Sequence, residues 1–282
     1  MSFQTSGPPP LPNPAAMDLE LTGKRAIVTG GSSGLGKSIA RELAREGVRV
    51  AIVARTVERL QNAAAELKNQ TGADVVAVTC DTGKDQDVRA MVSTVVDHLG
   101  GVDILINAAG QTSGGAPSPR LADIDDSIFW PDVNVKVMGY IRCIREVAPH
   151  MASQGRGRIV SIGGLAARST GSAVRSIRNV AVAAMTKNFT DELGPSGISL
   201  CVVHPGMVRT ERTAAAVQKR AAREGVTPNE IERRSAQAYA IGRLVNAEEV
   251  AWVVTFLASP RAIAINGDAV VTSGGSLGSI YY

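Results

Sequence analysis

The sequence is poor in cysteine and in aromatic residues. Only three cysteines occur among 282 residues, and Cys80, Cys143 and Cys201 lie far apart with no CxxC spacing. An odd number of dispersed cysteines argues against a disulfide framework and against a zinc site. We therefore expect no bound metal, and we expect small buried thiols in a reducing cytoplasm. Aromatic residues make up only 4% of the chain. Abundant Ala, Val, Ile and Gly instead suit buried parallel strands.

Long apolar runs and dense basic patches are also missing. No stretch approaches the roughly 18 apolar residues that span a bilayer, and residues 1–17 lack the basic and apolar regions of a signal peptide. The net charge is +4, but the basic residues are interleaved with acidic ones. This pattern predicts neither a nucleic-acid partner nor a membrane partner, whereas a small anionic ligand suits the mild positive excess.

Proline is concentrated near the N-terminus, where five prolines fall between Gly7 and Pro14. Proline fixes φ and has no N–H, so this segment can form neither a helix nor a strand ladder. The sequence therefore predicts a flexible proline-rich arm over residues 1–17. Because no repeat or linker follows Gly23, it also predicts one domain over residues 18–282.

From Gly23 onward, short apolar runs alternate with amphipathic helical stretches. The runs that read as buried strands are 25–29, 48–54, 74–79, 103–106, 158–162, 198–203 and 268–271. This alternation predicts an α/β fold: a Rossmann-type, doubly wound parallel sheet of about seven strands with helices on both faces. The charged segment Thr210–Gly242 interrupts the pattern and reads as a helical insertion, either a lid or a solvated surface helix.

A glycine-rich turn follows the first predicted strand. Residues 29–36 read Thr-Gly-Gly-Ser-Ser-Gly-Leu-Gly and open a predicted helix over 34–46. Gly30 can adopt a positive φ, while Gly34 and Gly36 let the backbone approach a pyrophosphate. The helix N-terminus would direct N–H groups at the phosphates, so the turn predicts dinucleotide binding. The predicted loop residues are Gly30, Ser32, Ser33, Gly34, Leu35 and Gly36.

The spacing of this turn, Gly-x-x-x-Gly-x-Gly, resembles that of the classical short-chain dehydrogenase/reductase family. Residues 107–110, Asn-Ala-Ala-Gly, match the family's NAG motif, and Asp81 matches its adenine-contacting acid. Pro205-Gly206 followed by Thr210 matches the segment that holds the nicotinamide carboxamide. The resemblance covers about residues 18–275. The further cofactor contacts that it implies are Asp81, Asn107, Ala108, Gly110, Pro205, Gly206 and Thr210.

The end of the second predicted strand bears on which dinucleotide binds. NAD-preferring sites place an acid there to hold the ribose 2′-hydroxyl, but Val50–Thr56 contains none. By the resemblance, Arg55 stands where NADP-dependent members carry a phosphate-pairing arginine, and its fork suits a phosphate. We expect NADP(H) rather than NAD(H); the alternative is that Arg55 is a surface charge at a strand end.

The resemblance implies four catalytic residues, of which this sequence retains one. Asn134 matches the family's Asn. Gly164 stands at the Ser position, and Arg175 and Asn179 replace the Tyr and Lys of the family's Tyr-x-x-x-Lys pair. No tyrosine occurs between Ile141 and Ala238, so the standard proton relay cannot operate.

Arg175 and His204 are the other catalytic candidates. Arginine keeps its proton at neutral pH, so Arg175 would act as a fixed cation that stabilises an oxyanion or clamps an anion. Its alternative is a surface ion pair. The resemblance places His204 near the nicotinamide, and histidine titrates near neutral pH; its alternative is a hydrogen-bonded structural residue. The predicted catalytic set is thus Asn134, Arg175 and His204.

Three functions stay open at this point. The first is an NADP(H)-dependent oxidoreductase that acts on a carbonyl or alcohol through a non-standard site. The second is a catalytically silent cofactor-binding subunit, sensor or scaffold, and the third is a lyase or isomerase. The resemblance also implies a homodimer or homotetramer, and Arg175, Arg178 and Arg209 indicate an anionic small-molecule substrate.

Overall fold

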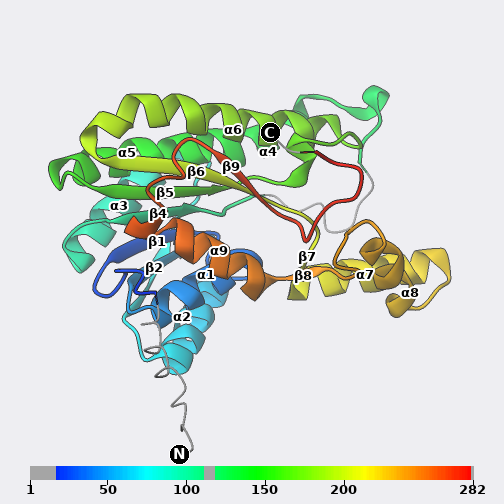
Figure 1. Ribbon diagram of the computed structural model, residues 1–282, viewed down its shortest axis with the longest axis horizontal. Helices are drawn as coiled ribbons and strands as arrows, with labels where there is room; N and C mark the ends of the chain where they lie inside the picture. The colour runs from blue at the N-terminus through cyan, green and yellow to red at the C-terminus, as the bar shows by residue number, and fades with distance from the viewer. Residues whose placement is uncertain (1–16, 111–117, 281–282) are drawn as a thin grey trace, which may run out of the picture.

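The computed structural model describes residues 17–110 and 118–280. All but the last residue of the predicted proline-rich arm lies outside them. The described chain forms a seven-stranded parallel sheet in the order β3-β2-β1-β4-β5-β6-β9, which confirms the predicted Rossmann-type fold (Figure 1). The strands are β1 Arg25–Thr29, β2 Arg49–Ala54, β3 Val75–Thr79, β4 Ile104–Asn107, β5 Gly157–Ile162, β6 Ile198–Pro205 and β9 Ala269–Thr272.

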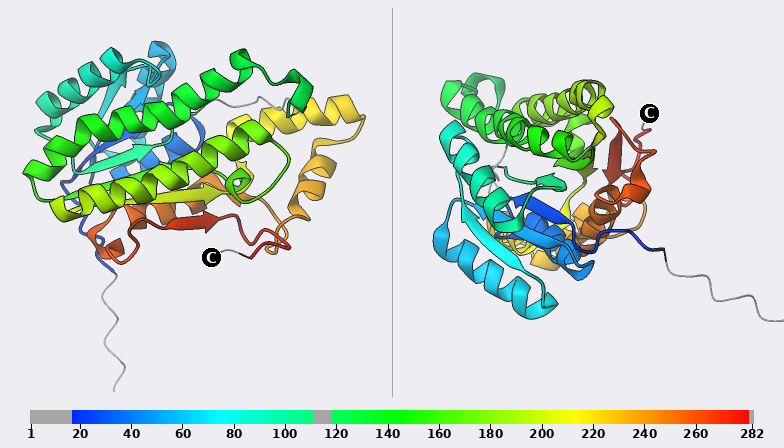
Figure 2. Two further views of the ribbon diagram at one scale, coloured as in Figure 1. Left: turned by 90° about the horizontal axis from the view of Figure 1, so that it is seen from above. Right: turned by 90° about the vertical axis from the view of Figure 1, so that its left-hand side faces the viewer.

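Helices cover both faces of the sheet (Figures 1 and 2). One layer holds α1 Gly34–Arg45, α2 Val57–Thr71 and α9 Ala247–Leu257, and the other holds α3 Asp85–Leu99, α4 Asp126–Val133, α5 Gly139–Ser153 and α6 Ala173–Leu193. Each layer packs its own buried apolar cluster against the sheet. The strand order reverses between β1 and β4, and ligands of open α/β sheets bind at the carboxyl edge of such a switch point.

Two helices extend beyond the carboxyl edge of the sheet, at the right of Figure 1. These helices, α7 Glu211–Glu224 and α8 Pro228–Ala236, pack on each other through Val217, Ala221 and Ile231. Short strands hold the segment at both ends, because β7 Val208–Arg209 pairs in parallel with β8 Val245–Asn246. We call residues 210–242 the flap.

The long helix predicted from about Asp132 to Ser153 is not regular. Helix α4 starts earlier, at Asp126, and a π-helical turn at Asn134–Met138 separates it from α5. A π-turn takes more residues per turn than an α-helix and is frequent at functional sites. It therefore changes which side chains of this segment face the sheet.

The three cysteines are buried and unpaired, as the sequence predicts. Across residues 17–110 and 118–280, no helix is long and apolar enough to cross a membrane. The same residues contain no group of three His, Cys, Asp or Glu side chains arranged to hold a metal ion.

Candidate active site

The glycine loop after β1 packs directly against the turn after β4. The Thr29 hydroxyl accepts the backbone N–H groups of Ala108 at 3.0 Å and Ala109 at 3.2 Å, and it donates to the carbonyl of Ile106. Gly30 has φ +69°, and a Cβ placed on it would lie 2.8 Å from the Ala108 carbonyl oxygen. Backbone atoms of Ala108 and Ala109 thus occupy the space that a side chain at position 30 would need.

The start of α1 is equally close to this loop. A Cβ on Gly36 would collide with the Gly30 carbonyl, and Gly34, the first residue of α1, has φ +57°. Bare backbone N–H groups of a helix N-terminus therefore face the carboxyl edge of the sheet, the arrangement that binds phosphates. Glycine is required in this loop because the backbone packing leaves no room for a side chain.

Asn107 ends β4 beside this loop and is completely buried. Neither its amide nitrogen nor its amide oxygen has a hydrogen-bond partner among the described residues. An orphaned buried amide costs about 1–3 kcal/mol. Together with the glycine cradle, this unpaired amide fits a dinucleotide, and a nicotinamide dinucleotide bound here would supply or accept a hydride.

Arg55 and Asp81 lie at the same edge, after β2 and β3. Val53 is in register with Thr29, so Arg55 follows β2 beside the glycine loop. The Arg55 side chain is exposed and has no partner in the described part of the chain. Asp81 accepts the N–H of Gly83 at 3.0 Å. The predicted cofactor residues of β1 to β4 are thus gathered along one edge.

The flap touches the glycine loop through its first turn. Thr210 caps α7, and the adjacent Glu211 accepts the Gly34 N–H at 2.6 Å while Arg212 donates to the Ser33 hydroxyl. At its other end, Tyr239 accepts the N–H of Met207 at 2.9 Å, just after Pro205-Gly206. The contacts of Glu211 and Arg212 with the glycine loop were not predicted from the sequence. The only available signal was that both residues directly follow Thr210, a predicted cofactor contact.

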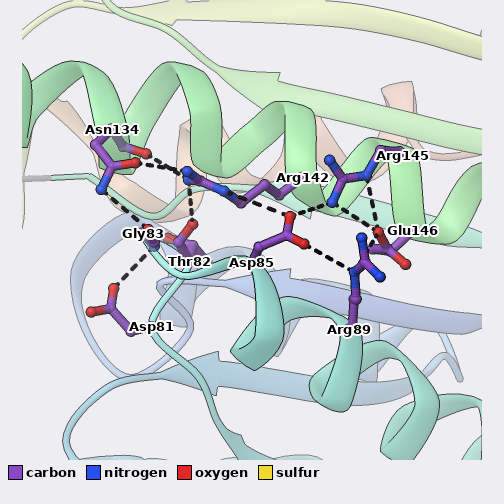
Figure 3. A network of polar contacts seen from close by, with 9 residues as sticks. All are labelled: Asp81, Thr82, Gly83, Asp85, Arg89, Asn134, Arg142, Arg145 and Glu146. Atoms are coloured by element: carbon purple, nitrogen blue, oxygen red, sulfur yellow. Dashed lines mark hydrogen bonds and ion pairs between the residues drawn. The ribbon is translucent and has the colours of Figure 1, made fainter.

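Asn134 is turned toward the loop after β3 (Figure 3). Its amide nitrogen donates to the Gly83 carbonyl at 3.2 Å, and its amide oxygen accepts from Arg142 at 2.9 Å. Arg142 also donates to the carbonyl of Thr82. The amide nitrogen and the amide oxygen of Asn134 are therefore both hydrogen-bonded, and together with Arg142 they hold residues 82–83. The structure does not bring this side chain together with His204.

Lys136 faces the other side of the π-turn and is buried. Its Nζ donates to the Gly163 carbonyl at 2.8 Å, at the end of β5. Burial, and then the Arg178 cation, lower the pKa of Lys136 to about 7, although the Asp132 carboxylate opposes the shift. The sequence-based prediction omitted this residue. One signal was available, because Lys136 precedes Tyr140, Ile144, Val147 and Met151 on one buried helical stripe.

His204 is buried at the end of β6, where its Nδ1 accepts the Gly164 N–H at 3.1 Å. Burial, and then the nearby cations of Arg168 and Lys136, lower the pKa of His204 to about 4. The ring is therefore neutral at pH 7 and carries its proton on Nε2. Gly163 has no room for a side chain beside this ring.

Helix α6 contributes the remaining residues. Asn179 is buried, and its amide oxygen has no partner in the described part of the chain. A Cβ on Gly164 would lie 3.0 Å from the amide nitrogen of Asn179.

The two arginines of α6 have different surroundings. Arg178 forms an ion pair with Asp132 in which both side chains are 13% exposed. Arg175 is half-buried, and the described residues offer its guanidinium no partner. We call Asp132, Lys136, Arg178, Asn179 and His204, around Gly163 and Gly164, the β5-end cluster.

Comparison with known proteins gives one consistent result. Residues 24–221 match the family model described as short chain dehydrogenase. The chain is 34% identical over 254 residues to a putative ketoacyl reductase of Streptomyces coelicolor, covering 89% of this chain and 95% of the relative. It is 30% identical over 262 residues to the 7alpha-hydroxysteroid dehydrogenase of Escherichia coli, covering 92% and 96%.

Solved structures agree with these sequence relatives. The L-sorbose reductase of Gluconobacter frateurii, complexed with NADPH and L-sorbose, superimposes with a TM-score of 0.88 at 29% identity, over 94% of this chain and all of that chain. An F189W actinorhodin polyketide ketoreductase with NADPH gives a TM-score of 0.82 at 32% identity, over 89% and 96%.

Proposed function

The chain belongs to the short-chain dehydrogenase family, and we propose that it is an NADP(H)-dependent oxidoreductase acting on the carbonyl or alcohol group of a small molecule. One observation carries the proposal. The glycine cradle after β1 and the β5-end cluster open on the same edge of the sheet, at the ends of the adjacent strands β1, β4, β5 and β6. A hydride carrier and a polar substrate group would therefore meet there.

The site that we propose is non-standard for the family. Gly164, Arg175 and Asn179 stand at the positions of the family's Ser, Tyr and Lys, and Arg175 supplies a fixed positive charge to the substrate oxygen or to an anionic substrate group. His204, neutral and bound to Gly164, shapes the pocket at the end of β6. Asn134 holds the loop after β3.

NADP(H) is the proposed cofactor, and Arg55 supports this preference. At the end of β2, the Arg55 cation has no partner in the described chain, and no acidic residue lies beside it in the sequence. This positive charge complements a 2′-phosphate, whereas a free 2′-hydroxyl calls for an acid. Two of the structures above are NADPH complexes. We further propose that residues 210–242 act as a lid, because this flap contacts both the glycine loop and the segment after β6.

The wild-type protein is expected to oxidise NADPH with members of a carbonyl panel that includes sugars, ketosteroids and ketoacyl thioesters. Arg175→Ala is expected to lower kcat/KM about 100-fold, the size of one lost oxyanion donor, with NADPH affinity unchanged. Lys187→Ala, an exposed cation on the same helix, is the matched control. Absorbance at 340 nm measures turnover and NADPH fluorescence measures binding.

A silent protein would behave differently in this experiment. Wild type would bind NADPH without turnover, while the triple variant Gly164→Ser, Arg175→Tyr and Asn179→Lys would gain activity. The serine and the lysine belong together, because the Cβ of residue 164 would lie 3.0 Å from the Asn179 amide nitrogen. That result would replace the enzyme proposal by the binding subunit.

We also propose that the chain self-associates through α4 and α6, as family members often do. Exposed apolar side chains lie on this face: Ile177 is 51% exposed, Val180 50% and Trp130 57%. Ile177→Asp with Val180→Asp is expected to convert an oligomer to a monomer in light scattering. Val57→Asp, equally exposed at 51% but on α2, should leave the mass unchanged. A monomeric wild type at micromolar concentration would contradict the proposal.

A further inference from the structure

We propose that Lys136 is the proton donor and acceptor of this site. In the reducing direction its Nζ ammonium gives a proton to the substrate carbonyl oxygen, and in the oxidising direction its neutral amine takes the proton from the alcohol. The inference rests on the proposed oxidoreductase function. It supplies the proton-transfer group that a permanently charged Arg175 cannot be.

The geometry of the π-turn places Lys136 between the two halves of the site. A Cβ on Gly110, which ends the turn after β4, would lie 3.9 Å from Lys136 Cδ. The side chain then reaches the end of β5, where Nζ bonds the Gly163 carbonyl. The lysine stem thus runs from the cofactor side of the edge to the β5-end cluster, and the amine bonds the carbonyl of the residue before Gly164, which stands at the family's Ser position.

Other proton-bearing groups of β6 and α5 are unsuited to the role. His204 already uses Nδ1 to accept the Gly164 N–H, and burial holds its pKa near 4. Tyr140 is buried and donates to the Ile162 carbonyl, and burial raises the pKa of its hydroxyl. Cys143 and Cys201 are buried thiols whose pKa values burial also raises. These groups do not exchange a proton readily near pH 7.

Titratable groups on three other elements act on the Lys136 amine. Arg178 of α6 opposes its charge and Asp132 of α4 favours it. His204 of β6 also faces the amine and is neutral at pH 7, because burial and the Arg168 and Lys136 cations lower its pKa. Burial is the largest influence and leaves the pKa near 7. A general acid or base works best when its pKa lies near the operating pH, because both protonation states are then available.

The step balances without a further reactant. A nicotinamide dinucleotide held by the glycine cradle would supply the hydride that reduces the carbonyl carbon. As the new O–H bond forms, one N–H bond of the Lys136 ammonium breaks and leaves a neutral amine, which regains a proton from solvent. The sum is a carbonyl, NADPH and one proton giving an alcohol and NADP⁺.

Two variants test the proposal on the active enzyme. Lys136→Met keeps an unbranched stem without an acidic proton, and Lys136→Arg keeps the charge but does not deprotonate at neutral pH. Both are expected to lower kcat about 100- to 1,000-fold, with the NADPH Kd within about twofold of wild type. The limb near pH 7 in the kcat/KM profile should also disappear. Wild-type activity in Lys136→Arg would overturn the proton role.

A second readout needs no cofactor or turnover. Because folding lowers the pKa of Lys136 from 10.5 to about 7, the unfolded chain binds more protons than the folded chain between these values. Stability then rises with pH across this window. The urea midpoint of the wild-type apoprotein should climb from pH 7 to 9.5 relative to that of Lys136→Met, and equal profiles would overturn the proposal.

Failure of the oxidoreductase function and failure of the proposed Lys136 role give different results in these experiments. If wild type shows the pH-dependent midpoint but turns over no substrate, the oxidoreductase function fails and the proton role fails with it. If wild type turns over substrate and Lys136→Met is equally active, the oxidoreductase function stands and the proposed role of Lys136 is wrong.

Discussion

A Gly30→Ala variant is expected to lose both stability and dinucleotide binding, whereas Gly72→Ala should lose only a little stability. The two glycines have nearly the same backbone conformation, with φ +69° and +70°. An alanine at either position meets the left-handed penalty of about 1–2 kcal/mol. A difference in stability loss between the two variants therefore reports on the atoms that surround each glycine.

The surroundings of the two glycines differ sharply. A Cβ on Gly72 meets nothing within 4 Å, but one on Gly30 would lie 2.8 Å from the Ala108 carbonyl oxygen. Overpacking of this kind costs about 1–3 kcal/mol more, so Gly30→Ala should lose about 2–5 kcal/mol in urea unfolding. Equal losses in the two variants would contradict the tight packing of the glycine loop on the turn after β4.

The binding defect follows from the same contact. The added methyl group pushes the loop after β1 away from the turn after β4, and the hydrogen bonds between the Thr29 hydroxyl and the Ala108 and Ala109 amides lengthen. NADPH fluorescence should show a Kd at least about tenfold weaker, because the N–H groups of α1 then miss the phosphates. Gly72→Ala, remote from the loop, should bind as wild type does.

An Arg55→Glu variant is expected to reverse the cofactor preference. Loss of a charge-assisted pair to the 2′-phosphate costs about 1.5–3 kcal/mol, and the new carboxylate adds repulsion. The NADPH Kd should therefore weaken about 100-fold. NADH lacks the 2′-phosphate, so its Kd should stay level or improve as the glutamate accepts the ribose hydroxyl.

Arg59→Glu is the matched control for this charge reversal. Arg59 is exposed on the first turns of α2, one helical turn beyond Arg55, and the substitution changes the net charge by the same amount. Fluorescence titration with both cofactors at two salt concentrations separates a local contact from a general field effect. A similar loss of NADPH affinity in both variants would contradict a phosphate contact of Arg55.

Much of the fold could be predicted because buried parallel strands leave a strong sequence pattern. The apolar runs at 25–29 and 103–106 correspond to β1 and, with a shift of one residue, to β4 Ile104–Asn107. The exact ends of the elements could not be predicted, because the apolar pattern does not say where the hydrogen-bond ladder stops. The long helix after β4 was predicted without its π-turn, because side-chain periodicity is read on the assumption of 3.6 residues per turn.

Lys136 escaped prediction for a different reason, because lysine is almost never fully buried. Read backward from Tyr140, the buried helical stripe does place Lys136 on the buried side. The contact of Glu211 with Gly34 could not be predicted either, because 177 residues separate the partners and no local pattern joins them.

This contact gives the glycine loop an internal anion. The Glu211 carboxylate occupies the N–H of Gly34, and one N–H cannot serve a carboxylate and a phosphate equally well. Any phosphate that binds at this amide must therefore displace the Glu211 carboxylate. By reciprocity, whatever holds that carboxylate in place weakens anion binding at the amide by the same free energy. The protein thus carries its own competitor for this phosphate contact, on the first turn of α7.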